Sequence, residues 1–331
     1  MRRMPDQRDI PYARLTPEVV LDALEGVGIA GDGRLLALNS YENRVYQVWR
    51  EDAPPVVAKF YRPGRWTNAQ IDEEHAFVAE LDAAEVPVVA PLALHGHMLN
   101  AFENYRFAAY PRRGGRAPEL EDLATLEWIG RYLARIHLVG AQRPFAARPA
   151  LSIVEFGTDA RAFLLAAGFI PEDLVAAYTS VVDQALDGIR TCYRRAGEVS
   201  TLRLHGDCHG GNILWTDDGP HFVDFDDARL GPAVQDLWML LAGDRESMER
   251  QLAAVLDGYE ALRDFDRREL HLVEALRTLR LIHYAAWIAR RWDDPAFPAA
   301  FPWFGSQRYW QDRILELREQ IAAMDEPPLT A

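Results

Sequence analysis

The residues best suited to chemistry stand in two neighbouring stretches, residues 205–212 (HGDCHGGN) and residues 222–227 (FVDFDD). Asp207 and Asn212 are five positions apart, and Asp224 is twelve positions beyond Asn212. A carboxylate such as that of Asp207 can accept a hydrogen bond from an attacking hydroxyl group and align it. The oxygens of Asn212 and Asp224 are hard ligands of the kind that Mg²⁺ prefers. The pattern therefore predicts one catalytic carboxylate and a Mg²⁺ site made by the other two residues.

The order of these residues along the chain matches that in protein kinases. Those enzymes place a hydroxyl-orienting Asp, a metal-binding Asn and a second metal-binding Asp in the same order. Magnesium neutralises charge on the transferring phosphate, where most of the catalytic effect lies. The spacing thus favours transfer of the γ-phosphoryl group of MgATP to a hydroxyl, with ATP as co-substrate.

Two other interpretations fit the same residues. A polar turn followed by a solvated acidic loop would also contain Asp and Asn. A zinc or di-metal hydrolase could use His205, Asp207, His209 and Asp224 as ligands. The glycines around the two histidines disfavour the helix that a zinc-binding His pair four residues apart normally uses. We therefore favour the magnesium interpretation.

A lysine in an apolar segment indicates a second part of a nucleotide site. Lys59 lies within residues 55–61 (PVVAKFY), where a charge is costly unless it is paired or faces phosphate. Kinases pair such a lysine with a glutamate on the following helix. Here Glu74 is the favoured partner, and the adjacent Glu73 is the alternative.

The pattern of residues 1–110 predicts a small α+β lobe that binds the nucleotide. Thr16 followed by Pro17 is a typical helix start. β-Branched and aromatic residues predict the strands, the first two as an antiparallel pair. We expect strands at residues 44–50, 55–61, 88–94 and 105–110, and a helix at residues 68–83.

Residues 111–331 are predicted to form a larger, mostly helical catalytic lobe. His137 is expected to pack beneath the catalytic loop, and Asp236 to accept backbone hydrogen bonds from that loop, because a buried Asp needs donors. The tail, residues 325–331, is expected to fray. We expect helices at residues 119–139, 159–195, 233–263, 266–292 and 306–324, and short strands at residues 202–205, 213–215 and 221–225.

Composition narrows the class of protein. The 331 residues are 49% hydrophobic and carry a formal net charge of −14, which suits a soluble globular enzyme and disfavours nucleic-acid binding. Cys192 and Cys208 provide neither a disulfide framework nor a zinc spacing, which favours the reducing cytoplasm. No apolar segment of about 18 residues is present, and the basic N-terminus lacks the apolar run of a signal peptide. We expect a cytoplasmic monomer that does not bind membranes.

Several longer segments resemble a known family. The run HGDxHxxN followed by DF is similar to the aminoglycoside phosphotransferase and choline kinase superfamily, which shares the protein-kinase-like fold. The match is closer still to the family of bacterial stress response kinase A, and it covers nearly the whole chain. It rests on residues 38–47 (LNSYENRVYQ), 59–67 (KFYRPGRWT), 205–215 and 223–240.

This resemblance implies a bilobal α+β fold and a MgATP-dependent Ser/Thr protein kinase active in stress responses. It implies that Asp207 is catalytic, that Asn212 and Asp224 bind Mg²⁺, and that Asp224 also counts among the active-site residues. By the same resemblance, Ser40 would lie at the ATP phosphates. Residues 38–46 lack a glycine-rich loop, so backbone N–H groups and the Ser40 hydroxyl would cover the phosphates instead. Autophosphorylation would be natural in such a protein.

Two alternatives keep the same fold. A small-molecule kinase for an aminoglycoside, choline or a related alcohol would use the same residues in the same roles. A pseudokinase-like module would bind the nucleotide without transferring phosphate. Retention of Lys59, Asp207, Asn212 and Asp224 together argues against that second alternative.

Overall fold

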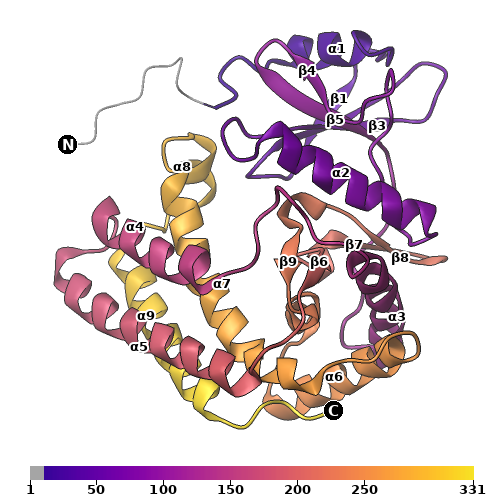
Figure 1. The fold of residues 1–331 in the computed structure, drawn as a ribbon. Helices are drawn as coiled ribbons and strands as arrows, with labels where there is room; N and C mark the ends of the chain where they lie inside the picture. Colours follow the sequence, from indigo (N-terminus) through magenta and orange to yellow (C-terminus); the bar gives the residue numbers. More distant parts are fainter. Residues whose placement is uncertain (1–10) are drawn as a thin grey trace. The chain divides into compact units, whose positions relative to one another are not determined.

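The computed structural model describes residues 11–331, which form two compact units (Figure 1). The first unit consists of residues 11–118, Phe145–Arg148 and Gly210–Ala228. The second unit consists of Glu119–Pro144, Pro149–His209 and Arg229–Ala331. The chain passes between the units several times, so each unit contains segments that are distant in the sequence.

The first unit contains the small antiparallel sheet that the sequence predicts. Its five strands lie in the order β1-β2-β3-β5-β4, and every neighbouring pair is antiparallel. The predicted pair at residues 44–50 and 55–61 is confirmed as β2 and β3, with Val45 opposite Lys59. The strands are β1 (Leu35–Leu38), β2 (Arg44–Val48), β3 (Val56–Phe60), β4 (Asn100–Phe102) and β5 (Tyr105–Pro111).

Two helices lie on opposite faces of this sheet (Figure 1). The buried side chains of α1 (Pro17–Glu25) share a core with Ala58 and Phe60 of β3. On the other face, Ile71 of α2 (Asn68–Ala83) packs against Ala108 of β5. Successive strand residues point to opposite faces, so Lys59 points to the α2 side.

Both helices begin where local side chains satisfy their first N–H groups. The Thr16 side chain accepts a hydrogen bond from the Val19 N–H, and Thr67 forms a capping box with Gln70. The helices predicted after Thr16 and at residues 68–83 are therefore confirmed.

Two later segments of the chain complete the first unit. One contains β7 (Ile213–Thr216) and β8 (Gly219–Phe222), which form an antiparallel hairpin. The rings of Phe225, after this hairpin, and of Phe145 both contact Phe77 of α2 edge-on. These contacts hold both segments against α2.

The prediction of a strand at residues 88–94 is wrong. This segment makes isolated bridges instead, from Val88 to Phe222 and from Leu94 to His97. Pro91 stands in its middle and has no N–H to donate to a ladder, which explains why a regular strand does not form.

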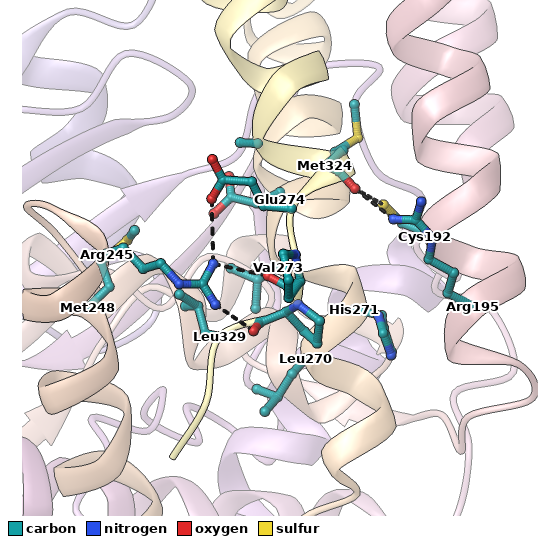
Figure 2. A pocket seen from close by; sticks show the side chains of 14 residues that line it. Cys192, Arg195, Arg245, Met248, Leu270, His271, Val273, Glu274, Met324 and Leu329 are labelled. Carbon is teal, nitrogen blue, oxygen red and sulfur yellow. Dashed lines mark hydrogen bonds and ion pairs between the residues drawn. The ribbon is translucent and has the colours of Figure 1, made fainter.

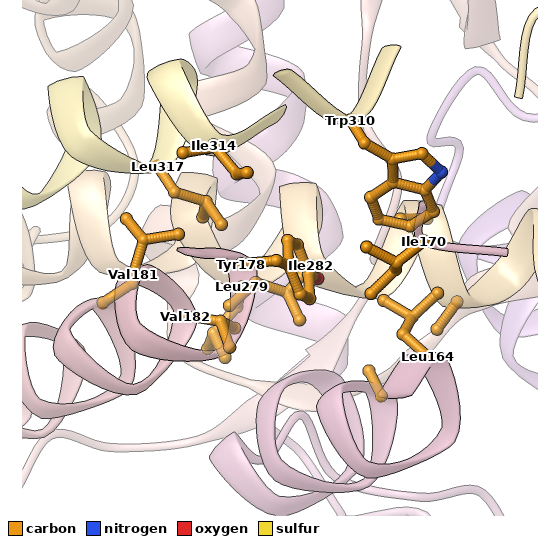
Figure 3. Packing of buried hydrophobic residues seen from close by; sticks show 14 of the residues in the cluster. Leu164, Ile170, Tyr178, Val181, Val182, Leu279, Ile282, Trp310, Ile314 and Leu317 are labelled. Carbon is orange, nitrogen blue, oxygen red and sulfur yellow. The ribbon is translucent and has the colours of Figure 1, made fainter. Parts of the chain in front are cut away.

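The second unit is mostly helical, as predicted. Figure 3 shows its core, where Tyr178, Leu279 and Trp310 come together from three different helices. Within residues 11–331, no helix is both long and apolar enough to cross a lipid bilayer. The helices are α3 (Leu123–Gly140), α4 (Asp159–Ala167), α5 (Glu172–Ala196), α6 (Arg245–Glu260), α7 (Val273–Arg290), α8 (Ala296–Ala300) and α9 (Gln307–Asp325), and β6 (Leu202–Leu204) pairs with β9 (Arg229–Gly231).

Two predicted helices are interrupted. The helix predicted at residues 159–195 divides at Gly168, whose φ of +71° ends α4 in the left-handed conformation. The one predicted at residues 233–263 begins as two short 3₁₀ turns, and α6 starts only after Asp244, whose side chain caps it.

The C-terminal tail is ordered, which corrects the prediction that it frays. Arg245 donates hydrogen bonds to the carbonyl oxygens of Pro327 at 3.0 Å and Pro328 at 2.7 Å (Figure 2). Leu329 is only 5% exposed, and it lines a cavity of about 90 Å³ together with Met248 and other residues. An arginine 82 residues away in the sequence therefore holds the tail, and local sequence carries no sign of it.

The helices α3 and α6 cross at two glycines. A Cβ atom at Gly130 of α3 would lie 2.0 Å from a backbone carbonyl oxygen of α6, and one at Gly258 of α6 would lie 1.9 Å from a carbonyl oxygen of α3. Only glycine fits at such distances. The crossing brings Tyr259 of α6 against His137 of α3, with ring centroids 5.5 Å apart.

We predict that Gly258→Ala lowers the free energy of unfolding by about 2 kcal/mol or more, because the helices must separate to admit the methyl group. The better helix propensity of alanine does not offset this clash. Urea unfolding followed by circular dichroism measures the effect. Gly305→Ala is the control, since its added Cβ would meet nothing within 4 Å. Equal stability of the two variants would contradict the tight crossing.

Candidate active site

Lys59 lies at the centre of a buried cluster of charges in the first unit. Its Nζ is 2.9 Å from Asp224 Oδ1, 3.2 Å from Asp226 Oδ1 and 4.0 Å from Glu74 Oε1. Lys59, Glu74 and Asp226 are buried, whereas the Asp224 side chain is 52% exposed. The cluster therefore brings together the predicted residues Lys59, Glu74 and Asp224, and it also includes Asp226. Of these four side chains, that of Asp224 is accessible to solvent.

Charge pairing determines the charge of Lys59 and Asp226 in this cluster. Burial alone would lower the pKa of Lys59, but Asp224 and Asp226, and then Glu74, raise that pKa well above its ordinary value. Burial raises the pKa of Glu74, and the positive charge of Lys59 opposes that shift. Burial would also raise the pKa of Asp226, but Arg65 and Lys59 together hold it below its ordinary value. Lys59 is thus a permanent positive charge inside the unit.

The two adjacent glutamates of α2 have different partners. Glu74 lies near Lys59 and also 3.4 Å from Arg148 Nη1. Glu73 instead accepts hydrogen bonds from the backbone N–H groups of residues 146–148, at 2.7 and 2.8 Å. Successive helical residues point about 100° apart, so the two carboxylates are directed to different neighbours. Of the two glutamates, Glu74 is therefore the one beside Lys59.

Asn212 and Asp224 flank the open end of the β7–β8 hairpin. Asn212 directly precedes β7, and Asp224 follows β8. Ile213 pairs with Phe222, and the Val223 N–H donates to the Asn212 carbonyl oxygen at 3.0 Å. The spacing of twelve positions between Asn212 and Asp224 therefore arises from one hairpin, which brings the chain after β8 back beside Asn212.

These two residues fit a magnesium site by the chemistry of their donors. A carboxylate and a carboxamide oxygen are both hard ligands, and Mg²⁺ commonly keeps several waters beside one or two such protein ligands. The side chain of Asn212 is partly exposed and that of Asp224 about half exposed, so both are accessible. Asp224 adopts a φ of +61°, in the left-handed region that most residues avoid.

Two arginines that the sequence did not single out complete the cluster. Arg65 forms ion pairs with Asp226 and with Asp227, the latter at 2.8 Å. Arg148 is buried and donates to the carbonyl oxygen of Ala228 at 2.6 Å. Their partners lie 161 and 80 residues away in the sequence, so no local pattern could identify them.

Ser40 lies in the loop between β1 and β2 and is partly buried. Neighbouring residues anchor this loop. Asn43 Oδ1 accepts a hydrogen bond from the Arg62 N–H at 3.1 Å, and Glu42 forms an ion pair with Arg62 Nε at 2.9 Å. The loop of Ser40 is therefore fixed to the segment that follows β3, the strand of Lys59.

Asp207 lies in a loop of the second unit that one buried carboxylate holds. Asp236 is fully buried and accepts hydrogen bonds from the N–H groups of His205 and Gly206, both at 2.8 Å. The Gln235 side chain donates to the Gly206 carbonyl oxygen at 3.0 Å. Gly206 has a φ of +86°, which glycine adopts without strain. The predicted role of Asp236 as an acceptor for this loop is confirmed.

A buried chain of polar groups holds Asp236 in turn. His137 Nε2 is 3.2 Å from Asp236 Oδ2, and His137 Nδ1 is 2.9 Å from the Tyr259 hydroxyl. Arg263 donates to that hydroxyl at 2.9 Å, so the hydroxyl proton is directed to Nδ1 and the ring proton on Nε2 to Asp236. His137 therefore supports the loop, as the sequence predicts.

Asp207 itself lies beside two basic side chains. It forms an ion pair with Arg280 of α7, and its Oδ2 is 3.5 Å from His209 Nε2. The Asp207 side chain is 22% exposed. Arg280 is 73 residues away in the sequence, and the helix that contains it gave no sign of this contact.

The hydrolase interpretation finds little support in this geometry. His205, which a zinc site would need, is fully buried, and its Nδ1 accepts a hydrogen bond from the Asp207 N–H at 3.3 Å. In the part of the chain that the structure describes, no three His, Cys, Asp or Glu side chains are grouped as the ligands of a zinc or di-metal hydrolase site would be.

The predicted site residues are divided between the two units. One of the points at which the chain passes from the second unit to the first lies between His209 and Gly210. The second unit contains Asp207, and the first contains Ser40, Lys59, Glu74, Asn212 and Asp224.

A buried glutamate contacts the turn that carries Asp236. Glu269 is 2% exposed, and its Oε2 accepts a hydrogen bond from the Val234 N–H at 2.8 Å. Burial raises the pKa of Glu269 to about 7, although the Val234 hydrogen bond opposes the shift. The folded state therefore holds this proton more tightly than the unfolded state does. The protonated Glu269 side chain therefore contributes fully to the stability of the folded state below the ordinary pKa of Glu. This contribution is lost as the pH rises through about 7.

We predict that Glu269→Gln becomes more stable relative to the native chain as the pH rises from about 5 to about 8, because only the native chain must ionise a buried carboxyl group. The gain in relative unfolding free energy should be about 1–3 kcal/mol. Urea unfolding at a series of pH values measures it. A difference that does not change over this range would show that Glu269 titrates normally.

Comparisons with known proteins agree on one family. A model described as the phosphotransferase enzyme family matches residues 34–273. Stress response kinase A of Salmonella choleraesuis is 48% identical over 318 residues, which is 96% of either chain. A protein named serine/threonine protein kinase RdoA from Salmonella typhimurium has the same identity and coverage. Stress response kinase A of Escherichia coli is 46% identical with the same coverage.

Solved structures show the same fold at low identity. An amicoumacin kinase matches with a TM-score of 0.71 at 17% identity, covering 93% of both chains. An aminopropanol kinase matches with a TM-score of 0.70 at 17% identity, covering 94% of this chain and 97% of the other. The small antiparallel sheet, the larger helical part and the relatives together show that this chain belongs to the phosphotransferase enzyme family, beside the stress response kinases A.

Proposed function

We propose that this chain is a MgATP-dependent Ser/Thr protein kinase of a bacterial stress response, and that it also phosphorylates itself. The observation that carries this proposal is the buried Lys59, paired with Asp224 and Glu74 beside the hairpin that ends in Asn212 and Asp224. In the second unit, Asp236 fixes the loop of Asp207, the carboxylate that we propose for the acceptor hydroxyl. Relatives at 48% identity are named a stress response kinase and a serine/threonine protein kinase, which supports a protein acceptor.

In the proposed reaction the first unit binds the nucleotide. Lys59 binds phosphate oxygens of ATP, and Ser40 contacts the phosphates with the N–H groups of its loop. Asn212 and Asp224 hold Mg²⁺, which neutralises negative charge on the phosphates when bound. Glu74 would hold Lys59 in place while Asp224 served as a ligand of the metal ion.

Asp207 acts on the acceptor. Its carboxylate accepts a hydrogen bond from the Ser or Thr hydroxyl and takes the proton as the reaction proceeds. The hydroxyl oxygen forms a bond to the γ-phosphorus atom, and the bond from that atom to the bridging oxygen breaks. ADP leaves with the electron pair, and the proton passes from Asp207 to solvent.

A small-molecule kinase is the second candidate, because the solved structures that share this fold include an amicoumacin kinase and a spectinomycin phosphotransferase. Their names describe those proteins at 17% and 14% identity. The acceptor therefore has to be tested directly.

We predict that the native chain with radiolabelled MgATP labels itself and a generic protein substrate, and does not label a panel of amino alcohols that includes choline and an aminoglycoside. Asp207→Asn should lower transfer by about 100-fold or more, because the hydroxyl loses its proton acceptor. Its affinity for MgATP should not change, since Asp207 is not a nucleotide ligand in this scheme.

The matched control is Asp218→Asn, which removes one carboxylate at the exposed tip of the β7–β8 hairpin. Turnover of an amino alcohol without protein labelling would overturn the protein-kinase proposal. Full activity of Asp207→Asn would remove that residue from the mechanism.

We also predict that Asn212→Ala and Asp224→Ala weaken binding of MgATP, with Asp224→Ala the more severe because it removes a full negative charge from the cation. Calorimetry with and without EDTA measures the metal-dependent part of the affinity. Asp217→Ala at the hairpin tip serves as the control. Unchanged Mg²⁺-dependent affinity in both site variants would place the metal ligands elsewhere.

A further inference from the structure

One side chain beside the proposed catalytic carboxylate has no part in the mechanism above. Arg280 of α7 forms an ion pair with Asp207, and the two side chains are 43% and 22% exposed. The pair therefore lies at the surface of the second unit and not in its core. An acceptor hydroxyl that reaches Asp207 must also approach the Arg280 guanidinium.

This neighbour discriminates between classes of acceptor. A guanidinium has a planar set of donors that matches a carboxylate, and it repels an ammonium group. A cationic amino alcohol at Asp207 would meet a like charge. An acceptor with a carboxylate next to its hydroxyl would instead give Arg280 a new partner while Asp207 turns to the hydroxyl. Unfavourable contacts of this kind are a common source of specificity.

The same face of α7 continues with aromatic and basic side chains. Tyr284 and Trp287 follow Arg280 at helical spacing, and their rings are stacked with centroids 5.7 Å apart. Arg291 directly follows the last residue of α7, and its guanidinium lies 5.1 Å from the centre of the Trp287 ring. Helix α7 contains three arginines and one glutamate, although the whole chain carries a net charge of −14. We call the face formed by Arg280, Tyr284, Trp287 and Arg291 the α7 strip.

We propose that Arg280 selects the acceptor, and that the substrate is a Ser or Thr with an Asp or Glu side chain beside it in an extended acidic peptide segment. This inference rests on the proposed function and specifies its substrate. From Arg280 to the end of α7 at Arg290 the helix rises about 15 Å, which an extended peptide covers in about five residues. The α7 strip thus matches the acceptor residue and one flank. Tyr284, which is 36% exposed, would lie beneath the peptide, whereas Trp287 is only partly exposed because its ring packs against Phe297 of α8.

The experiment uses three peptides that differ only in the residue next to the acceptor Ser, which is Glu, Gln or Lys. The native chain, Arg280→Gln, Arg280→Glu and Arg290→Gln are each assayed for kcat and KM. Arg290 is the matched control, because it is an arginine of the same helix that lies over Phe163, away from the strip. Thermal unfolding and MgATP binding check that every variant is folded.

The native chain should show at least a ten-fold higher kcat/KM for the Glu peptide than for the Gln peptide, and the lowest value for the Lys peptide. Arg280→Gln should remove this preference mainly through KM. Arg280→Glu should reverse it in favour of the Lys peptide. Arg290→Gln should keep the native order.

The outcomes separate this inference from the proposed function. Equal kcat/KM for the three peptides, or a native order kept by Arg280→Gln, would overturn the selection by Arg280 and leave the protein-kinase proposal standing. If Arg280→Glu does not fold, Arg280→Gln alone decides. Turnover of amino alcohols by the native chain, without transfer to any peptide or protein, would overturn the proposed function and this inference with it.

Discussion

The buried carboxylate of Asp236 is the group on which the arrangement of the second unit depends. A carboxylate without solvent is tolerated only where donors meet it, and here the loop N–H groups of His205 and Gly206 and the ring of His137 do so. Each N–H group left unpaired in such a place would cost about 1–3 kcal/mol. The loop of Asp207 is therefore fixed by a group that takes no part in the chemistry. The polar chain behind Asp236 requires the close crossing of α3 and α6, which only glycines allow.

The first unit also buries charged side chains, and there the charges pair with one another. Lys59, Glu74 and Asp226 are buried together, and Arg65 and Arg148 contribute the remaining positive charge. Asp224 differs from the others, because its side chain is half exposed and its backbone is left-handed. That conformation costs about 1–2 kcal/mol for a residue other than glycine, and the ion pair with Lys59 helps to maintain it. Strain and exposure coincide at the carboxylate that we propose for the metal ion.

Much of this protein is determined by interactions between residues close in the sequence. Thr16 and Thr67 cap the helices that follow them, and β2 and β3 pair across the seven-residue connection formed by residues 49–55. Asn212 and Asp224 flank the open end of one hairpin, because the eleven residues between them fold back on themselves. The types of these side chains, oxygen donors and a lysine in an apolar strand, then indicate the chemistry. Local propensity, helix capping and hairpin geometry act within a few residues, so the sequence shows them directly.

Tertiary structure decided the features whose partners lie far along the chain. Sequence alone left Glu73 and Glu74 open, and the choice depends on residues 146–148 and on Lys59. Residues 88–94 have the composition of a strand but make isolated bridges, because Pro91 cannot donate to a ladder. The ion pair between Arg280 and Asp207 joins residues 73 positions apart. Contacts of this kind depend on how separate segments pack, and short-range patterns in a sequence carry no information about that packing.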